Sequence, residues 1–166
     1  PKPVAVRPML LEIAENFRPL AAEKGLSLRV GLGSASVRTD PGLLRSILHN
    51  FVSNAIRYTQ EGRVLLGCRR QGERLLIEVW DSGPGIPESK LTEIFQEFRR
   101  LDQVSRHKES EKGLGLGLSI ADRMSRVLDH PIKVRSWEGI GTVFSVSVPI
   151  VAAKEIAPIE QEAGHR

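Results

Sequence analysis

The chain has 166 residues, 40% hydrophobic and 27% charged, which is enough for one domain with its own core and too apolar for a disordered chain. Its formal charge of +4 favours anionic partners without identifying one. The single cysteine, Cys68, excludes an internal disulfide and suits a reducing, cytoplasmic compartment. No stretch approaches the roughly 20 apolar residues of a membrane span, so we expect no membrane insertion by this region.

The first half of the chain predicts two amphipathic helices with a strand between them. Residues 7–25 carry apolar side chains at helical spacing, and Gly25 stands where a helix C-terminal cap belongs. The side chains of this stripe are Leu10, Ile13, Ala14, Phe17, Leu20 and Ala21. Residues 26–32 alternate apolar and polar, as a half-buried strand does. The Asp-Pro pair at 40–41 predicts the start of a second helix, which ends at the sequence TQEGR, residues 59–63.

The second half predicts two hairpins. Residues 64–70 and 74–81 have the composition of strands joined by a tight turn, and the second strand ends at Asp81. Residues 132–137 and 142–150 predict a closing hairpin.

Between the hairpins, residues 88–98 predict a short helix, 99–113 an irregular loop and 114–128 another helix. Residues 151–166 predict a tail or linker after a domain of residues 1–150. Together these elements indicate an α+β fold. We expect a two-layer α/β sandwich with a mixed, mostly antiparallel sheet that helices cover on one face.

A first polar cluster lies in the second helix. Asn50 and Asn54 are four residues apart and project from one side of that helix, beside its apolar stripe. Asparagine offers an oxygen that binds a hard cation without adding charge, and Mg²⁺ shares its ligands with phosphates. Arg57 and Tyr58 follow one turn later and would supply a phosphate contact and a flat surface for a base. A polar helix face with a helix-ending pattern explains the same residues.

A second cluster follows the strand that ends at Asp81. Gly83 and Gly85 allow the backbone to approach a flat ligand closely, since glycine has no Cβ. The carboxylate of Asp81 would accept a hydrogen bond from an exocyclic amine. A strand-to-helix connection stiffened by Pro84 and Pro87 is the alternative.

A third cluster, Gly113, Gly115 and Gly117, leads into a predicted helix. Glycines before a helix N-terminus leave backbone N–H groups free to face phosphate oxygens. Packing or hinge glycines would need no ligand. The three clusters together offer metal, base and phosphate contacts for one nucleotide.

In this order the motifs resemble those of the catalytic, ATP-binding domain of sensor histidine kinases. That family belongs to the gyrase, heat-shock-chaperone, histidine-kinase and MutL ATPase superfamily. NFVSNAIRYT resembles its N box, DSGPGIP its first glycine box, IFQEF its F box and GLGLGLSI its second glycine box. The closing GIGTVFSVSVP is similar to the last strand of the family, and the resemblance covers about residues 4 to 150.

The resemblance implies a Bergerat fold that binds ATP and Mg²⁺. Asn54, with Asn50, would hold the metal, and Asp81 would accept the adenine amine. Asn50 and Arg57 are the candidate catalytic residues, with Arg57 in place of the more usual lysine. The candidate nucleotide-binding residues are Asn54, Tyr58, Asp81, Gly83, Gly85, Ile86, Phe95, Gly113, Leu114, Gly115, Leu116 and Gly117.

The resemblance also implies transfer of the γ-phosphoryl group to a histidine on a separate dimerisation domain, and from there to a response-regulator receiver domain. None of His49, His107, His130 and His165 lies in the acceptor motif H-[DE]-x-x-[NT]-P, so the acceptor is not in this chain. Residues 96–113 would be a lid over the nucleotide, and one or two of its basic residues would reach the γ-phosphate. Those basic residues are Arg99, Arg100, Arg106, His107, Lys108 and Lys112.

Other functions remain open from the sequence. One is a nucleotide-sensing module without phosphotransfer. Another is a hydrolysing ATPase of the same superfamily, but its members carry a glutamate base where this chain has Asn50, and an amide is a poor proton acceptor. Nucleic-acid binding ranks last, because no run of basic residues with interleaved aromatics appears in the sequence. A membrane anchor elsewhere in the full-length protein stays open.

Overall fold

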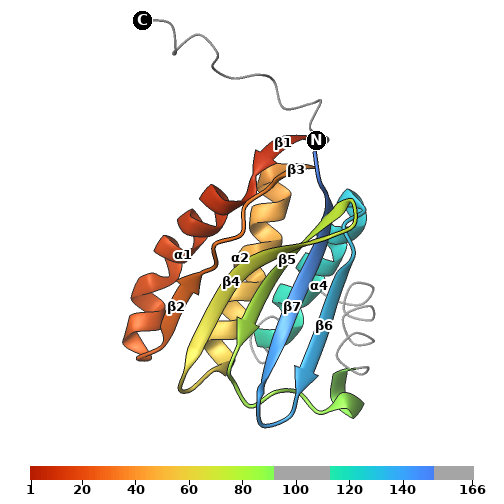
Figure 1. Ribbon diagram of the computed structural model, residues 1–166. Helices are drawn as coiled ribbons and strands as arrows, with labels where there is room; N and C mark the ends of the chain where they lie inside the picture. Colours follow the sequence, from red (N-terminus) through yellow and green to blue (C-terminus); the bar gives the residue numbers. More distant parts are fainter. Residues whose placement is uncertain (92–112, 152–166) are drawn as a thin grey trace, which may run out of the picture.

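The computed structural model describes residues 1–91 and 113–151, with the backbone alone at 113–117. Its layers are a five-stranded sheet and helices that pack on one face of that sheet (Figure 1). The helices are α1 (Val6–Glu23), α2 (Pro41–Tyr58) and α4 (Gly113–Leu128). The strands of this sheet are β2 (Ser27–Val30), β4 (Arg63–Gln71), β5 (Arg74–Asp81), β6 (Ile132–Trp137) and β7 (Gly141–Pro149). The predicted α+β sandwich is confirmed.

The strand order across the sheet is β2-β4-β5-β7-β6. β2 pairs with β4 in parallel, and the other three pairings are antiparallel, so the sheet is mixed as predicted. β5 lies at the centre, and its residues from Leu75 to Val79 are buried. Asp81 therefore stands at the end of the best-protected strand.

The core lies between the sheet and the helices. Ile47, Leu48 and Phe51 of α2 are fully buried, and the ring of Phe51 stacks on Phe144 of β7 with centroids 5.3 Å apart. Burial of each such side chain contributes about 1.5–3 kcal/mol. α2 is thereby fixed against the middle of the sheet.

The structure confirms the predicted cap at the end of the first helix and the predicted N-cap at the start of the second. At the end of α1, Gly25 has φ +69°, and the N–H groups of Gly25 and Leu26 donate to the carbonyls of Ala22 and Ala21. Glycine adopts this left-handed conformation without the steric penalty that a Cβ imposes. At the start of α2, the side chain of Asp40 accepts a hydrogen bond from the Leu43 N–H at 3.0 Å.

Some elements differ from the predictions. β1 (Lys2–Ala5) and β3 (Ser36–Thr39) form a separate antiparallel pair that the sequence does not predict. The predicted strand at 26–32 ends at Val30, and Leu32 is 90% exposed because the chain leaves the sheet there. Leu20, in the predicted apolar stripe of the first helix, is 51% exposed.

The rest of the predicted short helix beyond residue 91, the loop at 99–112 and the tail at 152–166 lie outside the described residues. Val151, placed in the tail by the sequence, is buried, and its N–H donates to the carbonyl of Ser36. Within residues 1–91 and 113–151, no helix is long and apolar enough to cross a membrane.

Candidate functional site

The two asparagines of α2 differ in their surroundings. Asn50 is half-buried, whereas Asn54 is 4% exposed and lies in the packed face, not beside the apolar stripe as its spacing predicts. Asn54 follows the buried Ile47 by seven residues, about two helical turns, so both point the same way. Nδ2 of Asn54 has no hydrogen-bond partner among the described residues. A buried amide nitrogen without a partner is costly, which makes this atom a candidate ligand contact.

The last turn of α2 is held by Lys24, the C-cap residue of α1. Nζ of Lys24 donates to the carbonyl oxygens of Ile56 at 2.7 Å and Arg57 at 3.0 Å. A cation here satisfies carbonyls that lack helical partners and complements the helix dipole. The Arg57 side chain is exposed and Tyr58 is half-buried, so a ligand at this helix end can reach both.

Asp81 lies at the end of β5 on the face that carries the helices, since side chains along a strand alternate between the two faces. The backbone N–H of Gly83 donates to Oδ1 of Asp81 at 2.9 Å. Burial raises the pKa of Asp81, while hydrogen bonds from the backbone of Gly83 and Thr142 act in the opposite direction. The carboxylate is partly desolvated, and its oxygens can accept further hydrogen bonds.

The loop after Asp81 meets the end of α2 at Gly83. A Cβ added at Gly83 would lie 3.0 Å from Oδ1 of Asp81, 3.2 Å from Oγ1 of Thr59 and 3.3 Å from the Tyr58 carbonyl oxygen. Thr59 is fully buried, and its Oγ1 has no partner among the described residues. The packing at this point therefore favours glycine at 83. It also brings the Asp81 carboxylate close to the Thr59 hydroxyl, which has no partner among the described residues.

The same loop is fixed from its other side by the β6–β7 hairpin. Gly85 has φ +74°, and a Cβ there would collide with the carbonyl of Trp137. The N–H of Ile86 donates to Oγ of Ser136 at 2.7 Å, and this hydroxyl lies 2.7 Å from Oγ1 of Thr142. Gly85 is thus needed for contact with the hairpin.

α4 runs antiparallel to α2. His130, just after α4, forms a hydrogen bond through Nε2 with Oγ1 of Thr39, just before α2, at 2.9 Å. The first residues of α4 therefore lie at the end where α2 finishes and β5 delivers Asp81 (Figure 1). His130 is remote from that end, and burial lowers its pKa.

The glycine cluster lies inside α4, not before it. Gly113, Gly115 and Gly117 occupy its first two turns, because the helix begins at Gly113. The first four N–H groups of any helix lack helical acceptors, so this segment still presents free donors to an anion.

Other predicted site residues can be placed only in part. Phe95 lies outside the described residues, as do the basic residues of the predicted lid. Leu114 and Leu116 are in the first turn of α4, where only the backbone is described.

Sequence reasoning missed three hydroxyl groups of this site, those of Thr59, Ser136 and Thr142. Thr59 is the last letter of the N-box motif, but nothing in its spacing indicates that the hydroxyl is buried next to Asp81. Thr142 pairs with Asp81 across β5 and β7, a contact that only the sheet register reveals.

Together these groups form a polar end of the molecule that suits a ligand with both an amine and phosphates. A partly desolvated carboxylate accepts from an amine, and a helix start binds anions. The described residues contain no group of three or more His, Cys, Asp or Glu side chains that could hold a metal ion.

Residues 39–152 match the family described as histidine kinase-, DNA gyrase B- and HSP90-like ATPase. The sensor histidine kinase RcsC of Escherichia coli is 32% identical over 93% of the chain, but the match covers 16% of RcsC. The circadian input-output histidine kinase CikA of Synechococcus elongatus is 39% identical over 68% of the chain and 15% of CikA. The chain thus spans about a sixth of the length of these curated relatives.

Solved structures show the same fold. Full-length ShkA in complex with AMPPNP has a TM-score of 0.75 and 32% identity, over 91% of this chain and 31% of ShkA. The nucleotide-free catalytic domain of the histidine kinase ThkA has a TM-score of 0.70 and covers 89% of this chain and 95% of that domain. Its identity is 22%, so this second likeness concerns the fold alone.

Proposed function

Because the chain belongs to the histidine kinase-, DNA gyrase B- and HSP90-like ATPase family, we propose that it is the catalytic domain of a sensor histidine kinase. In this proposal it binds Mg·ATP and passes the γ-phosphoryl group to a histidine of a dimerisation domain. A receiver domain of a response regulator would then take the phosphoryl group. The cytoplasmic location expected from the sequence belongs to the same proposal, as does the division into a catalytic domain at 1–150 and a tail.

One observation carries the proposal. The loop after Asp81 contacts the end of α2, and the antiparallel course of α4 puts its start at the same end of the molecule, although the three segments are far apart in sequence. Two buried polar atoms there, Nδ2 of Asn54 and Oγ1 of Thr59, have no described partner. A bound ligand that pairs with them would remove the cost of burying them.

Asp81 would recognise the base in this proposal. Its carboxylate would accept a hydrogen bond from the exocyclic amine of adenine, with Thr59 beside it. Guanine presents a carbonyl oxygen at that position, which a carboxylate repels. Tyr58 would lie along the nucleotide, and Gly83, Gly85 and Ile86 would line the base pocket.

The phosphates would lie between α2 and α4. Arg57 would contribute a fixed positive charge, and the N–H groups from Gly113 to Leu116 would donate to phosphate oxygens. Gly117, Phe95 and the basic residues of the lid would complete the contacts.

A magnesium ion fits the donor chemistry of α2. Asn50 and Asn54 would hold it through amide oxygens, which are hard and neutral ligands, and it would supply charge neutralisation for the phosphates. Such an ion keeps several waters and shares phosphate oxygens, so it does not need a cluster of protein carboxylates.

In the reaction, a ring nitrogen of the acceptor histidine forms a bond to the γ-phosphorus as the bond from that phosphorus to the bridging oxygen of ADP breaks. The chain's part is to hold the nucleotide in line and to balance its charge. Asn50 offers no proton acceptor for a water molecule, so phosphotransfer is favoured over hydrolysis.

The test is phosphotransfer from radiolabelled ATP to the cognate dimerisation domain. Wild-type chain should give acid-labile phosphohistidine, and Asn54→Ala should lose both transfer and magnesium-dependent ATP binding. Asn16→Ala is the matched control, because Asn16 is an exposed asparagine of α1, and it should behave as wild type. Bound nucleotide without any label would leave a nucleotide-sensing module instead. Phosphate release by the chain alone would indicate a hydrolysing ATPase.

A further inference from the structure

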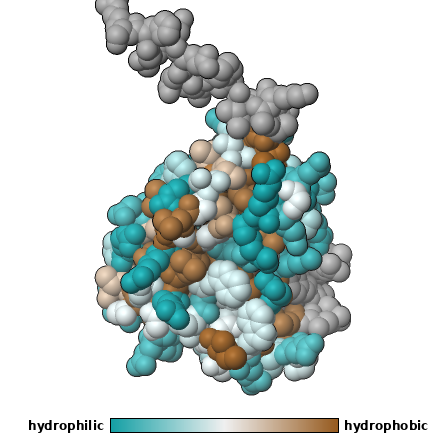
Figure 2. All heavy atoms as spheres, in the orientation of Figure 1, coloured by the Kyte–Doolittle hydropathy of each residue, from teal (hydrophilic) through white to brown (hydrophobic). Residues whose placement is uncertain are grey.

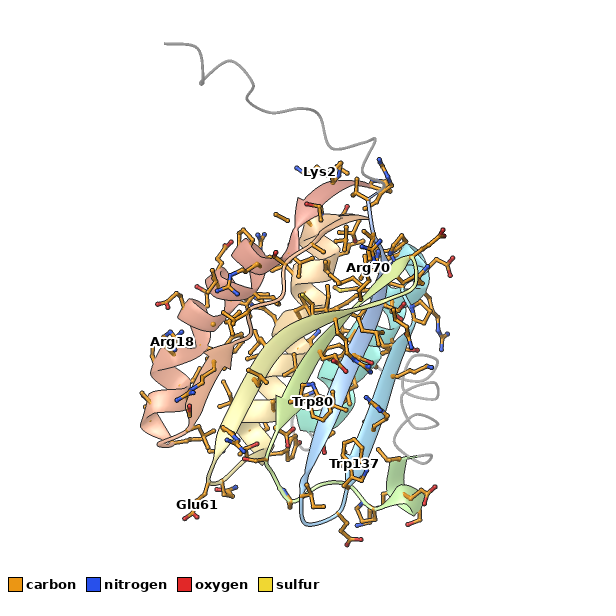
Figure 3. All side chains as sticks on the ribbon, viewed as in Figure 1. Lys2, Arg18, Glu61, Arg70, Trp80 and Trp137 are labelled. Atoms are coloured by element: carbon orange, nitrogen blue, oxygen red, sulfur yellow. The ribbon has the colours of Figure 1, made fainter. Side chains whose placement is uncertain are left out.

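The sheet face turned away from the helices carries two stacked tryptophans, Trp80 on β5 and Trp137 on β6 (Figure 3). Their ring centroids are 6.1 Å apart and their planes differ by 3°. The guanidinium carbon of Arg135 lies 5.8 Å from the centroid of the Trp137 ring. Trp137 is 42% exposed, which is high for so large an apolar side chain.

Beside this pair is a cavity of about 450 Å³. This volume falls within the range of pockets that hold a ligand or a large side chain. Its apolar lining includes Leu65, Trp80, Trp137 and Ile140. Its charged lining residues are Arg29, Arg63 and Asp81, so two positive charges stand against one negative charge. Leu65 and Ile140 are 40% and 70% exposed. In Figure 2, brown and pale side chains lie together over this part of the face, among hydrophilic ones.

The face has an excess of positive charge. Glu78, the carboxylate of β5 whose side chain alternates onto this face, is 5% exposed and forms ion pairs with Arg69 at 3.0 Å and Arg135 at 3.7 Å. Arg29 and Arg63, at the cavity, form no ion pair with any other residue in the ranges 1–91 and 113–151. An incoming anionic group would therefore meet uncompensated arginine there.

The stacking geometry indicates which anionic partner fits. One face of each tryptophan ring is taken by the other, and Arg135 lies over Trp137. Nucleic-acid bases need free ring faces for stacking, whereas an apolar side chain needs only an apolar hollow. Tryptophan and arginine are also the residues that contribute most at the centres of protein interfaces.

The geometry points to a docking site for an acidic segment of a partner protein. That segment presents one aromatic or branched apolar side chain to the cavity, and its flanking carboxylates pair with Arg29 and Arg63. The inference goes beyond the proposed function. The cavity borders Asp81 and Thr142 of the candidate nucleotide site, but Trp80, Trp137, Arg29 and Arg63, which would contact the segment, have no role in nucleotide binding.

The test uses indole N–H signals in a ¹⁵N NMR spectrum, since Trp80 and Trp137 are the two tryptophans of the chain. The probe is a short peptide with one phenylalanine flanked by glutamates. We expect it to shift both signals in a saturable way that weakens with salt. Peptides with lysine for glutamate, or with alanine for phenylalanine, should leave the signals in place.

Two double variants test whether the peptide binds at the cavity. The double variant Arg29→Glu, Arg63→Glu should bind the acidic peptide at least about tenfold more weakly, the loss of roughly one charged contact. Lys2→Glu with Arg70→Glu makes the same change in net charge at the far end of the molecule and should bind as wild type (Figure 3). Equal shifts with the lysine peptide, no shift with the acidic one, or tighter binding of a single-stranded oligonucleotide would each overturn the inference.

Discussion

At the scale of single residues, Asp81 is a carboxyl group whose burial has a measurable cost. Its pKa is raised above the usual value of 3.8, so the folded chain holds this proton more tightly than the unfolded chain does. The contribution of Asp81 to stability is therefore largest below the usual pKa of the group and is lost as the pH rises through the raised pKa. The ionised carboxylate of Asp81, which nucleotide recognition would use, therefore lowers the free energy of unfolding at neutral pH.

We expect Asp81→Asn to separate the two properties. At pH 7 the variant should unfold at the same or a higher temperature than wild type, because an amide still accepts from the Gly83 N–H and has no charge to bury. This advantage should shrink as the pH approaches the usual carboxyl range. ATP affinity should fall by about 10- to 100-fold, the loss of a charged hydrogen bond. Calorimetric titration with ATP measures the affinity, and thermal unfolding at several pH values measures the stability.

The control for this change is Asp129→Asn. Asp129 is exposed and has φ +56°, a conformation that asparagine also tolerates. It should leave ATP affinity unchanged. An Asp81→Asn variant that binds ATP as tightly as wild type would contradict the role of this carboxylate in base recognition.

The contrast between Asn54 and Thr59 explains how much of the site a sequence can reveal. Asn54 and Asp81 stand in motifs whose residue types and order have a chemical meaning, so they could be found in advance. The burial of Asn54 could not be predicted from the sequence, because it depends on which face α2 turns toward the sheet. The hydroxyls of Thr59, Ser136 and Thr142 have no distinctive spacing, and their role depends on contacts across the fold.

At the scale of secondary-structure elements, α2 can be tested at its two ends. Asp40→Ala removes the N-cap hydrogen bond to Leu43 and should lower the free energy of unfolding by about 0.5–2 kcal/mol. ATP affinity should not change, because this end is remote from Asn54. Lys24→Met removes the cation from the other end and should lower both stability, by about 1 kcal/mol, and ATP affinity.

Denaturant unfolding and ATP titration of the two variants supply the comparison. Asp40→Asn should restore the stability, since asparagine caps a helix as well as aspartate does. Equal loss of affinity in both α2 variants would mean that the whole helix, not its last turn, determines binding.

The predictability of the elements follows their length and pattern. α1, α2, β4, β5 and the closing hairpin have long periodic patterns, and all were predicted within a few residues. β1 and β3 are four residues each and form a sheet of their own, joined to the residue that follows β7 by a bridge between Val37 and Ile150. Segments this short have no pattern inside them that identifies a strand. The helix predicted over 114–128 begins one residue after the observed start of α4 at Gly113.

At the scale of the whole molecule, the β6–β7 hairpin links the two faces of the sheet. Trp137 lies on the face with the cavity, while its neighbour Ser136 faces the helices and accepts a hydrogen bond from Ile86 of the loop after Asp81. The N–H of Gly139 also donates to the Pro84 carbonyl at 2.7 Å. A change on one face therefore has a short, hydrogen-bonded route to the other.

We expect Ser136→Ala to weaken this link. The variant leaves the Ile86 N–H without its acceptor, which should cost about 1–3 kcal/mol and lower ATP affinity by roughly tenfold or more. It should also shift the indole N–H signal of Trp137, the next residue. Ser145→Ala, at a half-buried serine of β7 on the tryptophan face, is the matched control and should change neither readout. Unchanged ATP affinity in a folded Ser136→Ala chain would show that the hairpin does not position the nucleotide loop, and that the two faces act independently.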